Sequence, residues 1–124
     1  MISTYSMIET QLKQLDFLQT DLQVHCERIS DDRLYLEQEA ELADENGDEA
    51  TAERYYEELT LLVYPVRKLE SEIRHIKASI VEDYSELILT CTGDVSLANS
   101  ILKSKKNYVE TEQIITALKK KFNI

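Results

Sequence analysis

The chain has 124 residues, of which only two are Gly and one is Pro, and its formal net charge is −10. So few turn-forming residues exclude a fold of many short elements, and helices are the elements that become long enough to replace them. A hydrophobic fraction of 43% excludes a chain that is disordered by composition.

The first predicted helix covers residues 4–43, where seam positions recur at alternating steps of three and four. A 3.5-residue period over about six heptads is typical of a coiled coil. Gln19 and Arg33 are its polar exceptions, and the pattern stops before Asn46-Gly47, which favours a helix end. The other seam positions are Met1, Tyr5, Ile8, Leu12, Leu15, Leu22, Cys26, Ile29, Leu36, Ala40 and Ala43.

The second predicted helix covers residues 49–91 and repeats the same period from Ala52 to Leu87. Pro65 removes a backbone donor inside it. Because the heptad phase continues past Pro65, we expect a kink rather than a break. The short loop between the two helices makes them antiparallel neighbours, so residues 1–91 are predicted to form one long helical hairpin.

The position of the loop also sets an expected register for this hairpin. Leu22 should face the second helix between Leu69 and Ile73. Arg33 should lie within reach of Glu57 and Glu58 and form an ion pair there.

Residues 92–124 are predicted to form a separate module of two short helices. Gly93 can end the hairpin, and Asp94 can cap a helix from Val95 to about Ser104. A final helix should run from about Val109 to Phe122. Residues 98–124 hold six Lys against two Glu, whereas residues 1–97 hold 22 acidic against eight basic residues. The Lys side chains that could contact phosphate are Lys103, Lys105, Lys106, Lys119, Lys120 and Lys121.

This Lys-rich module allows two interpretations. Its outline suits a small DNA-binding regulator or an accessory of nucleic-acid machinery. However, no Arg follows Arg74, and Arg is the side chain that most often reads bases. Lys near a helix C-terminus also complements the helix dipole, so a cap that docks on the hairpin is the favoured interpretation.

A single seam leaves apolar residues of the hairpin uncovered, and uncovered apolar surface usually marks a contact. The candidate partner-binding residues are Phe17, Val24, Leu61, Val63 and Tyr64. We therefore expect a helical interaction or assembly protein that forms homo-oligomers or docks a protein partner. The acidic hairpin allows a further alternative, an acidic inhibitor that mimics nucleic acid and blocks a nucleic-acid-binding protein.

No motif indicates catalysis, a metal or a cofactor, so we expect a protein that is not an enzyme. His25, Cys26, His75 and Cys91 do not converge in the expected register. Asp44, Asn46 and Asp48 match the start of a calcium loop, but Glu49 stands where its turn glycine belongs. With no apolar leader, no membrane-length apolar run and only two Cys, a cytoplasmic, reducing location is expected.

Overall fold

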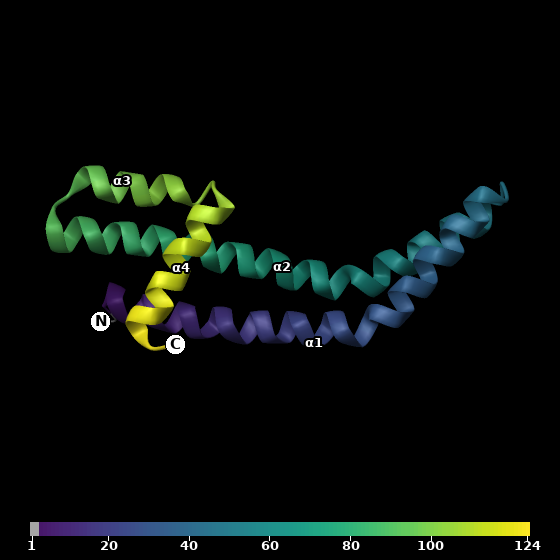
Figure 1. Ribbon diagram of the computed structural model, residues 1–124, viewed down its shortest axis with the longest axis horizontal. Coiled ribbons are helices and arrows are strands. Elements are labelled where there is room, and N and C mark those ends of the chain that lie inside the picture. Colours follow the sequence, from purple (N-terminus) through teal and green to yellow (C-terminus); the bar gives the residue numbers. More distant parts are fainter. Residues whose placement is uncertain (1–2) are drawn as a thin grey trace. The chain divides into compact units, whose positions relative to one another are not determined.

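A computed structural model describes residues 3–124, and these residues form four helices without any strand (Figure 1). The all-α fold class, with two long helices before two short ones, is therefore confirmed. Met1, the first expected seam position, lies outside the described residues. The helices are α1 (Thr4–Glu45), α2 (Glu49–Thr92), α3 (Val95–Ser104) and α4 (Tyr108–Phe122).

Both glycines end helices, as predicted. Gly47 has φ +75° and Gly93 has φ +68°, a left-handed conformation in which a side chain would be strained. After Gly47, the Asp48 N–H donates to the Ala43 carbonyl at 2.9 Å, and Asp48 Oδ1 accepts from the Thr51 N–H at 3.2 Å. One residue pair thus closes α1 and opens α2.

The short helices begin at polar caps. Asp94 Oδ1 accepts from the Leu97 N–H at 2.9 Å, as expected. Asn107 Oδ1 accepts from the Glu110 N–H at 3.1 Å, so α4 begins one residue before the predicted Val109. In α2 the helix continues through Pro65, in agreement with the unbroken heptad phase.

The chain divides into two compact units, whose boundaries lie inside α1 and α2. The acidic unit comprises residues Thr20–Ser71. The four-helix unit comprises the segment that ends at Gln19 together with Glu72–Ile124. The sequence predicts a domain boundary at residue 92, whereas α3 and α4 pack in the same unit as the start of α1 and the end of α2.

The four-helix unit holds the largest of the completely buried side chains. Ile8, Leu12 and Leu15 of α1 and Ile80 and Val81 of α2 are completely buried. Gln11 Nε2 donates to Ser79 Oγ at 2.7 Å, which places α1 antiparallel to α2 within about one turn of the expected register. Buried residues also come from the short helices, namely Ala98, Ile101, Ile115 and Leu118.

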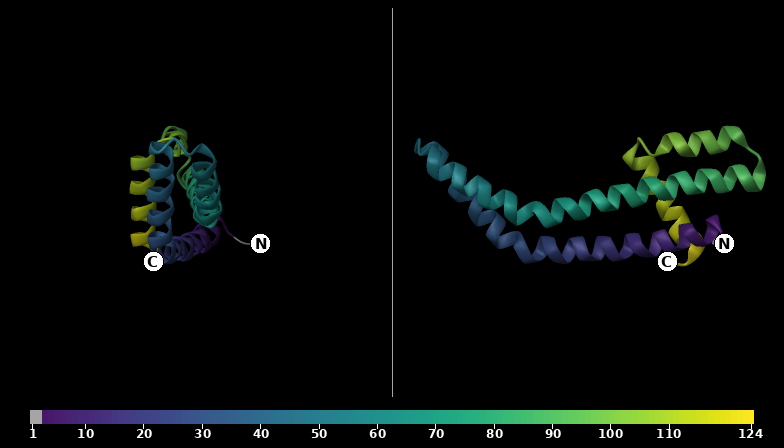
Figure 2. Two further views of the ribbon diagram at one scale, coloured as in Figure 1. Left: turned by 90° about the vertical axis from the view of Figure 1, so that its right-hand side faces the viewer. Right: turned by 180° about the vertical axis from the view of Figure 1, so that it is seen from behind.

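Polar contacts attach the short helices to this core. Ser85 Oγ donates to the Ala98 carbonyl at 2.6 Å and joins α2 to α3. As Figure 2 shows, α3 runs beside the end of α2, and α4 runs across towards the start of α1. There Tyr5 and Phe122 stack with ring centroids 4.4 Å apart. The C-terminal helices therefore pack against the ends of α1 and α2 and complete the four-helix unit.

The carboxyl group of Asp83 on α2 lies in an environment that disfavours its charge. Asp83 Oδ2 and Gln11 Oε1 are buried, and neither accepts a hydrogen bond from a described group of the protein. Burial raises the pKa of Asp83 above its usual 3.8, and the nearby Glu86 and Glu82 raise it further, although the neighbouring Gln11 side chain opposes the rise. The ionised form is thus disfavoured in the folded protein.

The Asp83→Asn variant should therefore be more stable than the natural protein at pH 7. A raised folded-state pKa means that protonation favours folding: this contribution is complete below the unfolded value of 3.8 and is lost as pH rises through the folded value. An amide removes the charge and offers Gln11 a donor, worth about 1 kcal/mol. Urea unfolding at pH 7 and below pH 3.8 should show an advantage at neutral pH that shrinks in acid. An equal advantage at both pH values would contradict this assignment.

In the acidic unit, α1 departs from the expected seam. Cys26 and Arg33 are exposed, and Leu22 and Ile29 are only partly buried. A helix of 3.6 residues per turn drifts away from a strict 3.5-residue repeat, and this drift leaves Cys26 and Arg33 off the face of α1 that packs against α2. Arg33 pairs with Glu37 on its own helix at 3.1 Å, so the expected ion pair with Glu57 or Glu58 is wrong.

Candidate partner-docking surface

The acidic unit leaves one long stretch of α1 only partly covered. No residue from Thr20 to Glu39 is buried, although α2 buries Val63, Val66 and Leu69 in the same unit. Apolar side chains of this stretch therefore face solvent, among them Val24, Leu34 and Tyr35. A helix whose apolar side chains are exposed presents contact surface.

A shallow groove of about 440 Å³ lies between α1 and α2 in this unit. Its apolar lining comes from Tyr35 and Leu36 of α1 and from Leu61 and Leu62 of α2, which face one another as the antiparallel register predicts. Leu61 is 76% exposed, the highest value among the large apolar side chains described. Asp32 and Glu58 supply one carboxylate from each helix.

The charge of the chain is concentrated in this unit. Thr20–Ser71 contains 15 acidic and five basic residues, a net of −10, whereas the remaining sequence contains nine of each. Tyr55 and then Glu39 raise the pKa of the Tyr35 phenol above its usual 10.0, so this hydroxyl keeps its proton at neutral pH. The groove therefore offers apolar side chains and a phenol hydroxyl within a strongly negative surface.

Of the five predicted partner-binding residues, four are exposed and one is buried. Val24, Leu61 and Tyr64 are exposed in the acidic unit, and Phe17 is exposed in the four-helix unit. Val63 is only 4% exposed, so its expected place outside the seam is wrong. The reason is helical phase: Val63, Val66 and Leu69 share one buried face of α2, whereas Leu61 and Tyr64, three residues apart, lie together on the opposite, exposed face. Tyr35 could not be predicted as a groove residue, because its position beside Leu61 depends on the pairing of two helices.

The six lysines proposed as phosphate contacts also separate into groups. Lys105 pairs with Glu82 at 2.8 Å, and Lys119 pairs with Asp16. These two lysines fasten the short helices to the long ones within the four-helix unit. Lys103, Lys106, Lys120 and Lys121 form no ion pair within residues 3–124. The lysines thus divide between internal contacts and solvent.

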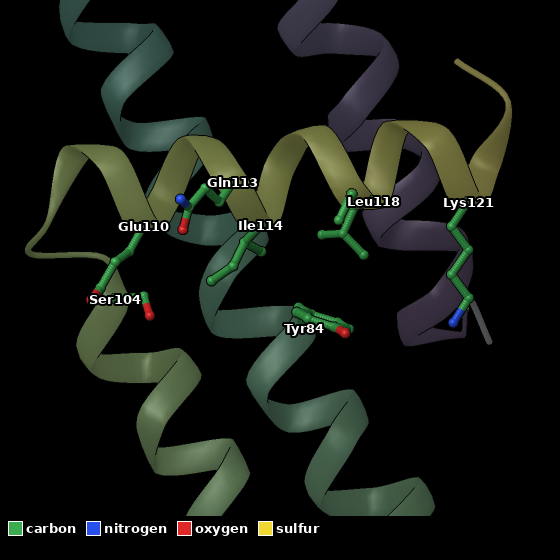
Figure 3. Close-up of a pocket in the computed structure, with 8 residues that line it drawn as sticks. Tyr84, Ser104, Glu110, Gln113, Ile114, Leu118 and Lys121 are labelled. Carbon is green, nitrogen blue, oxygen red and sulfur yellow. The ribbon is translucent and has the colours of Figure 1, made fainter.

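A second pocket, of about 350 Å³, lies in the four-helix unit beneath α4 (Figure 3). Tyr84 of α2 faces Ile114 and Leu118 across it, and Glu110 and Lys121 stand towards opposite ends of α4. Because these charges have opposite signs, the pocket does not favour a ligand of either charge.

Residues 3–124 contain no group of three or more His, Cys, Asp or Glu side chains arranged to hold a metal ion. His25 lies 3.5 Å from Asp21 on its own helix, and Cys26 and Cys91 are exposed, free thiols. At the loop, Asp48 caps α2, and its hydrogen bonds with Thr51 lower its pKa. That cap gives Asp48 a structural role.

Comparison with protein-family models, curated proteins and solved structures found no match to this chain. Within the described part of the chain, no helix combines the length and the apolar character that a membrane crossing requires.

Proposed function

We propose that this chain is a non-enzymatic helical interaction protein that docks a basic, amphipathic segment of a protein partner on its acidic unit. The observation that no residue of α1 from Thr20 to Glu39 is fully buried carries this proposal. Tyr35, Leu36, Leu61 and Leu62 would receive apolar side chains of the partner. Other proteins bind an amphipathic helix or an extended peptide segment in an apolar groove in the same way.

Charge favours a basic partner over a second copy of the chain. Docking two acidic units on each other would oppose two net charges of −10, whereas a Lys- or Arg-bearing segment would meet Asp32 and Glu58 beside the groove. A homo-oligomer formed through the same residues is the alternative form of this proposal. Light scattering separates the two, because a second copy predicts a mass above 14.4 kDa that increases when salt screens the repulsion.

The decisive experiment uses the Leu61→Asp variant and a synthetic amphipathic peptide with Leu on one face and Lys on the other. The natural chain should bind this peptide, and a peptide with Glu in place of Lys should not bind. Leu61→Asp should weaken binding by about tenfold or more, because it places a carboxylate in the apolar contact. Simple charge attraction predicts the reverse, since the variant is more negative. Fluorescence anisotropy of a labelled peptide measures the difference.

Val109→Asp is the matched control, because it makes the same change in charge at an exposed apolar position of the four-helix unit. This control should leave the dissociation constant within about twofold of its original value. Equal loss in both variants, or tighter binding by Leu61→Asp, would rule out docking in the groove.

An acidic inhibitor that imitates nucleic acid is the second candidate, and the concentration of the net charge in residues 20–71 favours it. This function predicts capture of a basic nucleic-acid-binding protein that weakens steeply with salt. Capture should survive Leu61→Asp, because the apolar groove has no part in it. The same variant therefore distinguishes the two candidates.

A further inference from the structure

Four cationic side chains surround a pocket of about 250 Å³ in the four-helix unit. Arg74 and Lys77 reach it from α2, and Lys105 and Lys106 reach it from the turn between α3 and α4. Nearly 30 residues of sequence separate the two pairs, so only the fold brings them together. No acidic side chain lines this pocket.

The charge in the pocket is only partly neutralised. Lys77 pairs with Glu112, and Lys105 pairs with Glu82. Arg74 and Lys106 form no ion pair with any residue in the range 3–124. Two uncompensated cations therefore remain beside the pocket, in a unit that has no net charge. Such an arrangement favours an anionic ligand.

The start of α4 adds to this positive field. Tyr108 is the first residue of the helix and lines the pocket, so the positive end of the α4 dipole lies at the same place. The Glu110 N–H is already capped by Asn107. The helix end supports the site that the four cations define.

The Tyr108 ring gives the pocket an aromatic wall. This ring is 75% exposed, and Lys77 Nζ lies 5.5 Å from its centroid. An exposed ring beside cations is the combination with which proteins hold a base and its phosphate together. Polynucleotides are disfavoured, because Glu112 and Glu82 pair with Lys77 and Lys105 beside the pocket and would repel an extended polyanion.

We propose that this pocket binds a small nucleotide, with its phosphate between Arg74 and Lys106 and its base against Tyr108. This inference is independent of the docking function proposed above, because every residue of the site belongs to the four-helix unit. Inorganic phosphate shares part of this chemistry and should bind more weakly, since it has no ring to stack.

The test is titration of the full chain with adenosine 5′-monophosphate, inorganic phosphate and a 12-nucleotide single strand, followed by amide shifts in ¹H–¹⁵N spectra. Shifts should gather around residues 105–111, with the monophosphate bound more tightly than either other probe. The Arg74→Gln/Lys106→Gln variant should weaken monophosphate binding about tenfold, since it removes two charge-assisted contacts and breaks no observed ion pair.

Lys120→Gln/Lys121→Gln is the matched control, because it removes the same charge from exposed lysines outside this pocket. It should change the affinity less than twofold. Tyr108→Leu should abolish the preference for the monophosphate over inorganic phosphate. Absence of monophosphate binding, equal losses in the two double variants, or tighter binding of the single strand would each overturn the proposal.

Discussion

The Leu12→Ala variant should lower the free energy of unfolding by about 2–5 kcal/mol. Leu12 is completely buried in the four-helix unit, as are Ile8 and Leu15 of α1 and Ile80 and Val81 of α2. Truncation removes apolar contacts and leaves a cavity that these rigid helices cannot close. Urea unfolding followed by circular dichroism at 222 nm measures this loss.

Leu22→Ala provides the comparison, since the heptad pattern assigns Leu22 and Leu12 to the same seam. Leu22 is only partly buried in the acidic unit, so its truncation should cost about 1 kcal/mol. A cost for Leu22 as large as that for Leu12 would mean that α1 keeps its seam against α2 throughout. The incompletely buried stretch of α1 from Thr20 to Glu39, on which the docking proposal depends, would then not exist.

The Val63→Asp variant should lose about 3–5 kcal/mol of stability, because it places an unpaired charge at a position that is 4% exposed. The face that Val63 shares with Val66 and Leu69 is apolar and buried. Circular dichroism during urea unfolding gives the stability, and hydrogen exchange localises the loss to residues 20–71.

Leu61→Asp is the control for this prediction and is also the variant used in the docking experiment. At 76% exposure, Leu61 should tolerate Asp with a loss below about 1 kcal/mol, which is mostly helix propensity. The two variants thus separate a buried position from a contact position two residues away. Similar losses of stability in both variants would mean that Leu61 is buried in the core and would contradict an exposed groove at this position.

Much of the fold could be predicted from local features. Gly47 and Gly93 end helices where the sequence indicates, and Asp48 and Asp94 cap the helices that follow. These assignments succeeded because a helix end depends on a few adjacent residues and on backbone conformations that few residue types adopt. The antiparallel pairing also followed from the sequence, since a short loop leaves two long helices no other arrangement.

The candidate sites were less predictable, because they depend on side chains from separate helices. Leu61 was identified from its position outside the seam, whereas Val63 was misassigned because its burial depends on how α1 packs against α2. Arg74 could not be predicted as an anion contact, since no local sequence pattern relates it to Lys106. The pairing of Lys119 with Asp16 was likewise invisible to a pattern read along the chain.

The sequence by itself determined that the chain is helical, where its four helices begin and end to within two residues, and that acidic residues predominate before the C-terminal lysines. Composition, periodicity and capping are local properties, and each acts through neighbouring residues. Only the tertiary structure decided which seam positions are buried, since helical drift turns Cys26 and Arg33 outwards. It also placed the whole net charge in one unit and assembled the cationic pocket, because both depend on residues that are distant in sequence.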